Sequence, residues 1–416
     1  MKHRNKICLI LLFAVSFCAF LNSCIRPPHR KPSTDKYTPA KYWVRVCLLQ
    51  NIEKCKLEIP CDFEINDISG KTIVSEKTNT PVDVEIVSGG LKIGDITFET
   101  SALTITPQAD GIFTINENSY RGSIEFIVSD DKKSFTAINH LPMEAYLYGV
   151  IAAEMPSYWE QHALAAQAIA ARTYCLHTKR RFGKNRSWDL KATQAHQVYR
   201  GISAETSRTR LAVDETFGMV LWSKDCDGIT RLFPAYYSSI CGGSTENSVN
   251  VFGSSGGDFE ALGGVKCPYC KQNTRPKMFY WPTVKFNKRQ ADKRLMKKYP
   301  ILKKLGTIRK IVMAKEIDYG DFKRVATVKL VGSNGKSDIL RGEDFRLTID
   351  PTGSKIQSTI CKMVVVDGNY VFTSGRGFGH GVGLCQYGAR QLAKDGKRYR
   401  QILSYYYPKS KIETLY

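Results

Sequence analysis

The chain has 416 residues, enough for two or three domains, and its 43% of hydrophobic residues is ordinary for a globular protein. Its charge is unusual, because 61 Lys and Arg residues outnumber 39 Asp and Glu residues, which leaves a formal net charge of +22. Such a surplus suggests an anionic partner that attracts the chain through its overall field. The export signal described next excludes a cytosolic nucleic-acid protein, so we expect no nucleic-acid partner.

The first 24 residues predict an export signal. Three basic residues precede an apolar run over residues 7–21, which is short for a membrane span and typical of a secretory signal. The run ends in a Leu-Asn-Ser-Cys sequence that resembles a bacterial lipobox, in which Cys24 would be acylated. Asn22 is uncommon in that motif, so a plain cleaved signal and an uncleaved anchor stay open. We expect an exported protein of the periplasm or cell envelope that is anchored to the membrane.

Composition and pattern divide the rest of the chain. Residues 25–42, rich in Pro and Lys, are expected to form a tether. Alternating segments between Gly, Asn and Asp turns predict a β-rich N-terminal region at 43–138, most simply a scaffold. We expect a catalytic core at 139–275 that residues 373–416 complete, with an insertion lobe of strands and a basic helix at 276–372. The predicted fold class is α+β, with antiparallel strands, a central helix, and β-rich character in the N-terminal region and the insertion.

One carboxylate, Glu154, lies in an otherwise apolar run between Val150 and Pro156. A carboxyl group among apolar side chains has its charged form disfavoured and its pKa raised. A general acid that works near neutral pH requires such a shift. Glu154 is therefore a candidate catalytic acid, and the plainer alternative is a Glu on a half-exposed turn.

A long helix is predicted directly after this carboxylate. Ser157 and Glu160 have the spacing of a capping box, which predicts a helix from Ser157 to Arg181. Basic residues occupy its last turn, and Gly183 can adopt the left-handed conformation that ends a helix. A shorter helix is expected from Met143 to about residue 151, so Glu154 should lie just before the N-terminus of the long helix.

Thirteen cysteines in an exported chain favour disulfide bonds. Cys267-Pro-Tyr-Cys270, however, is a C-x-x-C turn that directs two thiolates at one metal ion, and Cys241 begins a Cys-Gly-Gly turn. With Cys385 as a fourth ligand, the thiolates would form a closed zinc site that stabilises structure and takes no part in catalysis. The spacing of these cysteines alone does not decide between a zinc site and disulfide bonds. Cys8, Cys18 and Cys24 belong to the signal region, and the other six are expected to be buried thiols or an occasional disulfide: Cys47, Cys55, Cys61, Cys175, Cys226 and Cys361.

Glycine occupies every second position from Gly375 to Gly383, around Arg376, Phe378 and His380. The spacing matches neither the dinucleotide fingerprint nor the P-loop, so it does not predict a phosphate site. Alternating glycines let the backbone approach a neighbour or a ligand closely while side chains point to one face. His380 could therefore face a groove, with a structural hydrogen bond as the equal alternative.

Three blocks of sequence, in this order, resemble the stage II sporulation protein D family of lytic transglycosylases. They are LPMEAYLYGVIAAEMPSYW with ALAAQAIAARTY, then YYSSICGGSTENSVNVFG, then GRGFGHGVGLCQYGARQLAKDGKRYRQILSYYYP. The resemblance runs from about Asn139 to the C-terminus, and residues 43–138 are similar to a weaker N-terminal part of the family. It implies an enzyme of cell-wall remodelling or division that cleaves peptidoglycan glycan strands, preferring strands stripped of their stem peptides.

The resemblance also implies roles for individual residues. Glu154 matches the Glu of the family's E-M-P motif, its catalytic acid, which would leave 1,6-anhydro ends on the cleaved strand. It implies that a structural zinc ion is held by Cys241, Cys267, Cys270 and Cys385, and it implies no organic cofactor. The residues expected to position the substrate are Gln167, Arg172, Ser239, Thr245, Arg376 and His380. A buried pairing partner is an equal alternative for Arg172, and an amidase or septal proteins are candidate partners.

Two other functions stay open. The family includes proteins described as amidase enhancers, so the chain could hold glycan without cutting it, and Glu154→Gln would then be tolerated. A zinc hydrolase is disfavoured, because no H-E-x-x-H motif occurs and the candidate ligands are thiolates. Loss of activity on chelation, with the fold intact, would favour the hydrolase.

Overall fold

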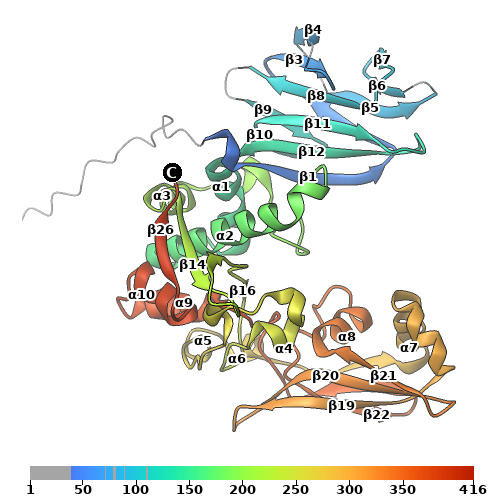
Figure 1. Cartoon of the computed structure of the whole chain (residues 1–416), viewed down its shortest axis with the longest axis vertical. Helices are drawn as coiled ribbons and strands as arrows, with labels where there is room; N and C mark the ends of the chain where they lie inside the picture. Colours follow the sequence, from blue (N-terminus) through green and yellow to red (C-terminus); the bar gives the residue numbers. More distant parts are fainter. Residues whose placement is uncertain (1–38, 71, 78–80, 89, 109–110) are drawn as a thin grey trace, which may run out of the picture. The chain divides into compact units, whose positions relative to one another are not determined.

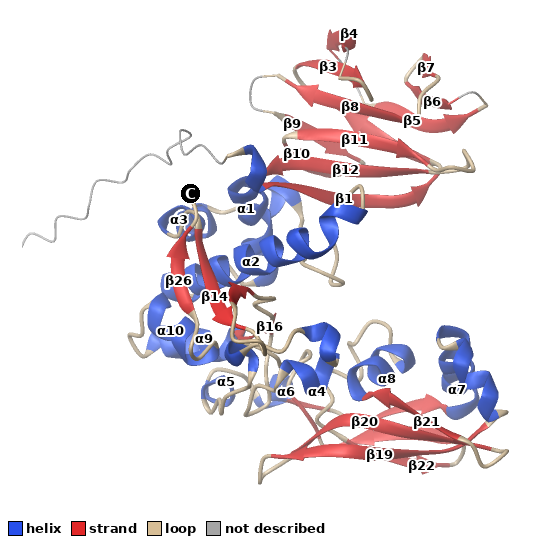
Figure 2. Cartoon of the chain, in the orientation of Figure 1, coloured by secondary structure: helices blue, strands red, loops and turns tan. Residues whose placement is uncertain are grey.

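The computed structural model describes residues 39–70, 72–77, 81–88, 90–108 and 111–416. The predicted signal, Cys24 and the tether up to residue 38 lie outside this part of the chain. In the described part, every helix is too short or too polar to span a membrane. The architecture combines several sheets, mostly antiparallel, with a group of helices (Figures 1 and 2), so the predicted α+β class is confirmed.

The N-terminal region consists of two sheets. Their strands are β1 Trp43–Ile52, β2 Lys54–Glu58, β3 Asp62–Asp67, β4 Thr72–Lys77, β5 Val82–Val87, β6 Gly90–Ile93, β7 Ile96–Phe98, β8 Ala102–Pro107, β9 Ile112–Ile115, β10 Asn118–Arg121, β11 Ser123–Val128, β12 Phe135–Pro142 and β13 Leu190–Lys191. The sheet orders are β13-β1-β12-β11-β8-β3-β4 and β10-β9-β2-β5-β6-β7. Buried and less buried residues alternate along β8 and β11, because successive side chains of a strand point to opposite faces.

The N-terminal sheets and the helical region share one hydrophobic core. β12 continues past residue 138, where we predicted the region to end, and β13 from the later part of the chain pairs in parallel with β1. The buried residues of this core run from Tyr42 to Tyr407 and leave out residues 281–372. The strands at 43–138 therefore form part of the packing around the helices.

The helical region is built around one central helix. Its elements are α1 Met143–Glu154, α2 Gln161–Phe182, α3 Ser207–Glu215, β14 Met219–Lys224, β15 Thr230–Leu232, β16 Tyr237–Ser238, α4 Ser248–Phe252, α5 Tyr269–Gln272, α6 Pro276–Phe279, β25 Leu384–Cys385, α9 Gln386–Lys394, α10 Tyr399–Tyr406 and β26 Lys411–Thr414. α2 packs against α1, α3, α9, α10 and β14. It is rich in Ala and buried around most of its circumference, as a helix enclosed on all sides must be.

The predicted capping box at the start of this helix is wrong. Pro156 and Trp159 close a turn, in which the Trp159 N–H donates to the Pro156 carbonyl at 3.0 Å. This turn delays the helix, so Glu160 and not Ser157 is the N-cap residue, and no side chain caps the helix. The Glu160 carboxylate instead pairs with Arg390 at 3.2 Å.

The end of α1 also differs from the prediction. α1 runs beyond residue 151 and includes Glu154 as its last residue, followed by Met155 in extended conformation. Glu154 therefore lies at the negative, C-terminal end of a helix dipole, which disfavours its charged form. At the far end of α2, Gly183 has φ of −65°, so the predicted left-handed end is wrong as well.

The predicted insertion contains a second hydrophobic core, whose buried residues lie between Trp281 and Phe372. Its elements are β17 Tyr280–Trp281, β18 Val284–Asn287, α7 Lys288–Lys298, β19 Ile308–Asp318, β20 Lys323–Gly332, β21 Ser337–Arg341, α8 Gly342–Ile349, β22 Lys362–Val366 and β23 Asn369–Thr373, followed by β24 Gly375–Arg376. The sheets have the orders β18-β23-β22 and β19-β20-β21. β17 pairs with β24, so the chain enters and leaves the insertion side by side.

Candidate active site

Glu154, at the end of α1, lies among polar groups from three distant segments. Its Oε1 accepts a hydrogen bond from the Val198 N–H at 2.9 Å, and the side chains of Tyr237 and Gln386 lie beside it. Within the described residues the amide nitrogen of Gln386 has no hydrogen-bond partner. Burial raises the pKa of Glu154, and the Val198 N–H and the side chains of Gln386 and Tyr237 oppose part of the shift. In the described part of the chain, no second carboxylate contributes to this shift. The half-buried carboxyl group therefore keeps its proton to higher pH than an exposed Glu does.

The Tyr237 hydroxyl is itself held in place. The amide nitrogen of Gln197 donates to it at 3.0 Å and to the carbonyl of Ala171, in α2, at 3.2 Å. The Tyr146 hydroxyl in turn donates to the amide oxygen of Gln197 at 3.2 Å. Because Tyr237 accepts from Gln197, its own proton is left to donate to Glu154.

No sequence pattern pointed to Tyr237, Gln386 or Val198. The first two lie inside the family blocks, next to residues that were singled out, Ser239 and Cys385. The parallel pairing of β16 with β25 brings these two blocks together, and pairing between two-residue strands leaves no local signal. Val198 contributes only its backbone N–H, so its residue type carries no information.

We expect Tyr237→Phe to move the activity of the chain to higher pH. The Tyr237 hydroxyl favours the ionised form of Glu154, so its loss raises the pKa of Glu154 further and extends the range in which the acid is protonated. The measurement is the pH profile of the glycan cleavage that the sequence resemblance predicts, with Tyr158→Phe, at a tyrosine that is 71% exposed, as the control. A profile that is unchanged or moves to lower pH would contradict this role.

Gln167, predicted to position the substrate, is fully buried in α2. Within the described ranges neither its amide nitrogen nor its amide oxygen has a hydrogen-bond partner. It lies one turn before Ala171, whose carbonyl binds Gln197. Burying an amide group without partners costs free energy. The Gln167 amide can therefore still form hydrogen bonds, and it lies on the same face of α2 as Ala171, whose carbonyl accepts from Gln197.

Arg172 is a buried partner in an ion pair, which was the alternative to its predicted role in positioning the substrate. It is fully buried, and its guanidinium donates two hydrogen bonds to the carboxylate of Glu144, at 2.8 and 2.5 Å. A third goes to the Met219 carbonyl at 3.0 Å, and the Tyr416 hydroxyl donates to Glu144 at 2.7 Å. Arg172 therefore joins α2, α1, β14 and the C-terminus, and it presents no surface to a substrate.

Ser239 and Thr245, two more of the predicted substrate residues, lie in the segment around Cys241. Thr245 is buried, and its hydroxyl accepts from the Val265 N–H at 2.8 Å. The carbonyl of Ser239, a half-buried residue, accepts from the Tyr387 N–H at 3.1 Å. The structure thus gives both residues a local structural role, and their contact with substrate stays a prediction.

His380 is enclosed by protein groups. Its Nδ1 accepts from the Val382 N–H at 3.0 Å, and its ring lies against Tyr236 and Phe252. Burial lowers the pKa of His380 to about 4, although a hydrogen bond with the Tyr237 backbone opposes the shift. The imidazole is therefore neutral at pH 7, and a role in substrate binding stays a prediction.

Arg376 lies between two aromatic rings. Its guanidinium is 5.2 Å from the centre of the Phe279 ring and 4.1 Å from that of Phe322, a separation typical of cation–π contacts. The residue is half-buried. The structure engages Arg376 with the protein itself, and its contact with substrate also stays a prediction.

The four cysteines predicted to bind zinc come together. Their Sγ atoms all lie within 4.8 Å of one another and are buried. The Sγ atoms of Cys241 and Cys270 are 3.7 Å apart, and tetrahedral zinc with bonds of about 2.3 Å requires an edge of about 3.8 Å. Cys385 Sγ accepts from the Cys241 N–H, and the Tyr406 hydroxyl lies 3.2 Å from Cys267 Sγ. All ten cysteines of the described ranges are free thiols, so this donor set fits zinc.

Comparison with known proteins identifies the family. A family model described as Stage II sporulation protein matches residues 131–222, which include Glu154 and α2. Stage II sporulation protein D of Bacillus subtilis is 30% identical over 293 residues, which cover 66% of this chain and 76% of that protein. The chain belongs to the stage II sporulation protein D family. The resemblance carried by the three sequence blocks is thereby confirmed.

Two further relatives extend the comparison. An uncharacterized protein of Brachyspira hyodysenteriae is 31% identical over 336 residues, 80% of this chain and 83% of that protein. The amidase enhancer of Bacillus subtilis is 29% identical over 369 residues, which cover 78% of this chain and 49% of the enhancer. The chain thus spans about half the length of the enhancer.

Proposed function

We propose that the chain is a lytic transglycosylase, which cleaves the bond between N-acetylmuramic acid and N-acetylglucosamine in the glycan strands of peptidoglycan. The observation that carries the proposal is Glu154, a half-buried carboxyl group with a raised pKa that accepts a hydrogen bond from the Val198 N–H and lies beside the side chains of Tyr237 and Gln386. Membership of the stage II sporulation protein D family supports it.

The reaction needs one carboxyl group. Protonated Glu154 donates to the glycosidic oxygen while the bond breaks through an oxocarbenium-like transition state. The carboxylate then accepts the proton of the muramoyl C6 hydroxyl, whose oxygen bonds to C1 and closes the 1,6-anhydro ring. No water is consumed, whereas the usual glycoside hydrolases employ two carboxylates. Tyr237 and Gln386 stabilise the ionised form of Glu154 between the two proton transfers.

Product analysis tests the reaction. Purified peptide-free glycan strands are digested with the chain, and the products are identified by mass spectrometry. We expect 1,6-anhydromuramoyl ends, which are one water molecule lighter than the reducing ends that hydrolysis leaves. Reducing ends would show that a second catalytic group activates water and would overturn the proposed mechanism.

The four clustered cysteines would hold a zinc ion with a structural role. When bound, such an ion cross-links distant segments and has no open position for a substrate. Here it would join the Cys241 loop and the Cys267–Cys270 turn to Cys385. Because Cys385 directly precedes Gln386, the cross-link would fix a side chain that lies beside Glu154.

We expect one zinc ion for each chain by elemental analysis, and loss of zinc in Cys267→Ser. Structural zinc stabilises the folded state strongly, so both this variant and chelation lower the midpoint of thermal unfolding. Cys226→Ser, at an exposed cysteine, serves as the control and keeps its zinc. Full zinc content in Cys267→Ser, or disulfides among the four cysteines, would contradict the site.

A second candidate function is the binding of glycan in support of an amidase. It is favoured by the relative named amidase enhancer, which the chain matches over 49% of that protein's length. A binder would retain glycan strands without cleaving them, would increase the rate of an added amidase, and would do both equally well after Glu154→Gln. The proposed location for either function is the cell envelope, where an anionic wall suits the charge of +22.

A further inference from the structure

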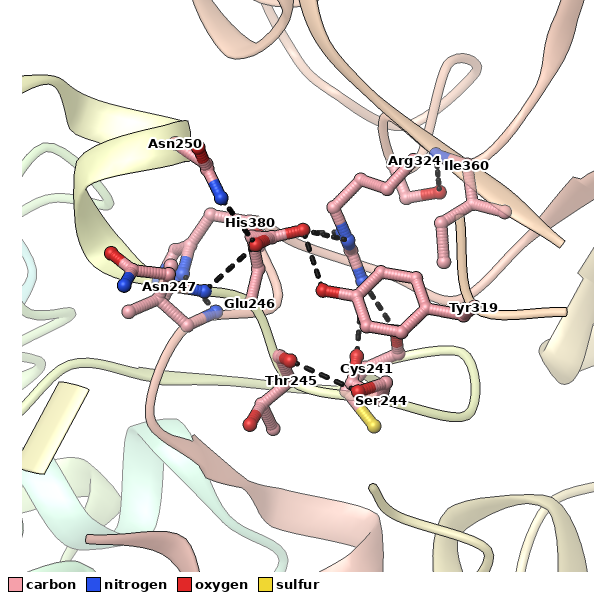
Figure 3. Close-up of polar contacts among 12 residues, drawn as sticks. Cys241, Ser244, Thr245, Glu246, Asn247, Asn250, Tyr319, Arg324, Ile360 and His380 are labelled. Carbon is pink, nitrogen blue, oxygen red and sulfur yellow. Dashed lines mark hydrogen bonds and ion pairs between the residues drawn. The ribbon is translucent and has the colours of Figure 1, made fainter. Parts of the chain in front are cut away.

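Two glycine-rich segments meet around one arginine that comes from the insertion. Arg324, the second residue of β20, is only 2% exposed. Its Nη2 donates to the carbonyls of Cys241 at 2.7 Å and of Ser244 at 3.3 Å, both in the Cys-Gly-Gly loop (Figure 3). A side chain of the insertion thus satisfies backbone groups of the helical region.

The same guanidinium lies against the second glycine-rich segment. Its Nη1 donates to the carbonyl of His380 at 3.5 Å. A Cβ atom at Gly381, which has φ of +75°, would lie within 3 Å of the guanidinium, so only glycine fits there. The Glu246 N–H donates to the Gly381 carbonyl at 2.8 Å, which joins the two segments directly. Gly381 therefore provides room for the side chain of Arg324. At this position the glycine allows close approach of a neighbouring protein group, and not of a ligand.

A buried carboxylate balances the charge of Arg324. Glu246 Oε2 lies 3.7 Å from Arg324 Nε, and both side chains are almost fully buried. The carboxylate also accepts from the Tyr319 hydroxyl at 2.7 Å, the Asn247 N–H at 2.9 Å and the Asn250 amide at 3.0 Å (Figure 3). Buried charges need a counter-charge and hydrogen bonds to offset their loss of water. Glu246 has both, whereas the Arg324 Nε has the ion pair at 3.7 Å and no hydrogen bond among the described residues.

The turn between β19 and β20 adds aromatic contacts to the same place. The rings of Tyr319 and Phe322 stack with their centres 5.0 Å apart, and Phe322 also lies against the guanidinium of Arg376. A Cβ atom at Gly243 would lie 3.1 Å from the Phe322 ring. Three side chains within six residues of one hairpin, those of Tyr319, Phe322 and Arg324, therefore contact the glycine-rich segments.

We propose that the β19–β20 hairpin is a clamp for the active site and that Arg324 is its positioning residue. Arg324 acts through the two segments that it joins. One carries Cys241, and the other continues from Gly381 to Cys385 and Gln386, whose side chain lies beside Glu154. The inference rests on the proposed function, because it assigns the insertion the task of holding the neighbours of the catalytic acid.

Hydrogen exchange of the full chain, measured by mass spectrometry, tests the clamp without any need for activity. In Arg324→Gln we expect exchange about tenfold faster in residues 241–247 and 377–385, and unchanged exchange in the N-terminal sheets. Arg324→Lys restores protection only in part, because one ammonium group cannot replace a planar fork of donors. Arg294→Gln is the matched control, since Arg294 also donates to a carbonyl, that of Ile349, but inside the insertion.

Kinetics with peptide-free strands give the second readout. Arg324→Gln is expected to lower kcat roughly tenfold or more, since small displacements of catalytic groups are costly, while KM stays within about twofold. Tyr319→Phe removes a single hydroxyl and shows the same pattern more weakly, which covers the case in which Arg324→Gln does not fold. Unchanged exchange in both glycine-rich segments, or faster exchange confined to the insertion, would overturn the clamp. If the wild-type chain does not cleave glycan, the proposed function fails and the exchange result still decides the clamp.

Discussion

Glu154→Gln is expected to abolish glycan cleavage while the chain still folds and still binds glycan strands. Gln keeps the shape of the side chain and an oxygen that accepts from the Val198 N–H, but it has no proton to donate. General acid–base catalysis contributes about 10²- to 10⁴-fold, and here one group serves both steps, so a loss of at least that size is expected. The measurements are product formation by mass spectrometry and retention of the strands in a binding assay.

The controls for this variant separate the two candidate functions. Glu160→Gln changes a nearby carboxylate that is paired with Arg390 and is expected to leave cleavage intact. Cleavage by Glu154→Gln at the wild-type rate would contradict the role of Glu154. If neither protein cleaves but both bind the strands and stimulate an amidase equally, the chain is an enhancer.

The raised pKa of Glu154 has a consequence for stability. A carboxyl group whose pKa is raised by folding stabilises the folded state fully below its unfolded pKa, and this contribution is lost as the pH rises through the folded pKa. The wild-type chain therefore loses stability over that range, whereas Glu154→Gln does not. We expect urea unfolding to show that the stability of the variant, relative to wild type, increases with pH across this window. We expect the proposed cleavage by the wild type to fall over the same window, because the acid loses its proton.

Arg172→Gln is expected to give the largest loss of stability, about 3–5 kcal/mol in the free energy of unfolding. The substitution leaves the carboxylate of Glu144 buried without its bidentate partner, and it removes a donor to the Met219 carbonyl. Folding removes both the Glu144 carboxylate and the Met219 carbonyl from water. The loss of stability therefore includes the free energy of a buried charge without a counter-charge. The measurement is urea unfolding at neutral pH, followed by circular dichroism.

A matched control lies on the same helix. Arg180 is exposed at the end of α2, and Arg180→Gln is expected to change the free energy of unfolding by less than about 0.5 kcal/mol. Combining Arg172→Gln with Glu144→Gln should cost less than the sum of the single variants, because the residues are in direct contact. A loss below about 1 kcal/mol in Arg172→Gln would contradict this account.

Local pattern predicted the parts of this protein that depend on neighbours in sequence. α9, from Gln386 to Lys394, is a helix of this kind, because an amphipathic run and a following glycine define a helix locally. The apolar run around Glu154 predicted the raised pKa, and burial is indeed its first cause. The capping box failed although its spacing was right, since the turn from Pro156 to Trp159 competed for the same residues.

The sequence by itself determined the α+β class and pointed to the four clustered cysteines and the candidate acid, since each depends on composition, periodicity or short motifs. Only the tertiary structure decided the partners. It paired Arg172 with Glu144, placed Tyr237 and Gln386 beside Glu154, and enclosed Arg324 between two glycine-rich segments. Arg324 and Cys241 are 83 residues apart. A hydrogen bond between residues that are so far apart in the sequence forms only when the chain has folded, so no local sequence pattern predicts it.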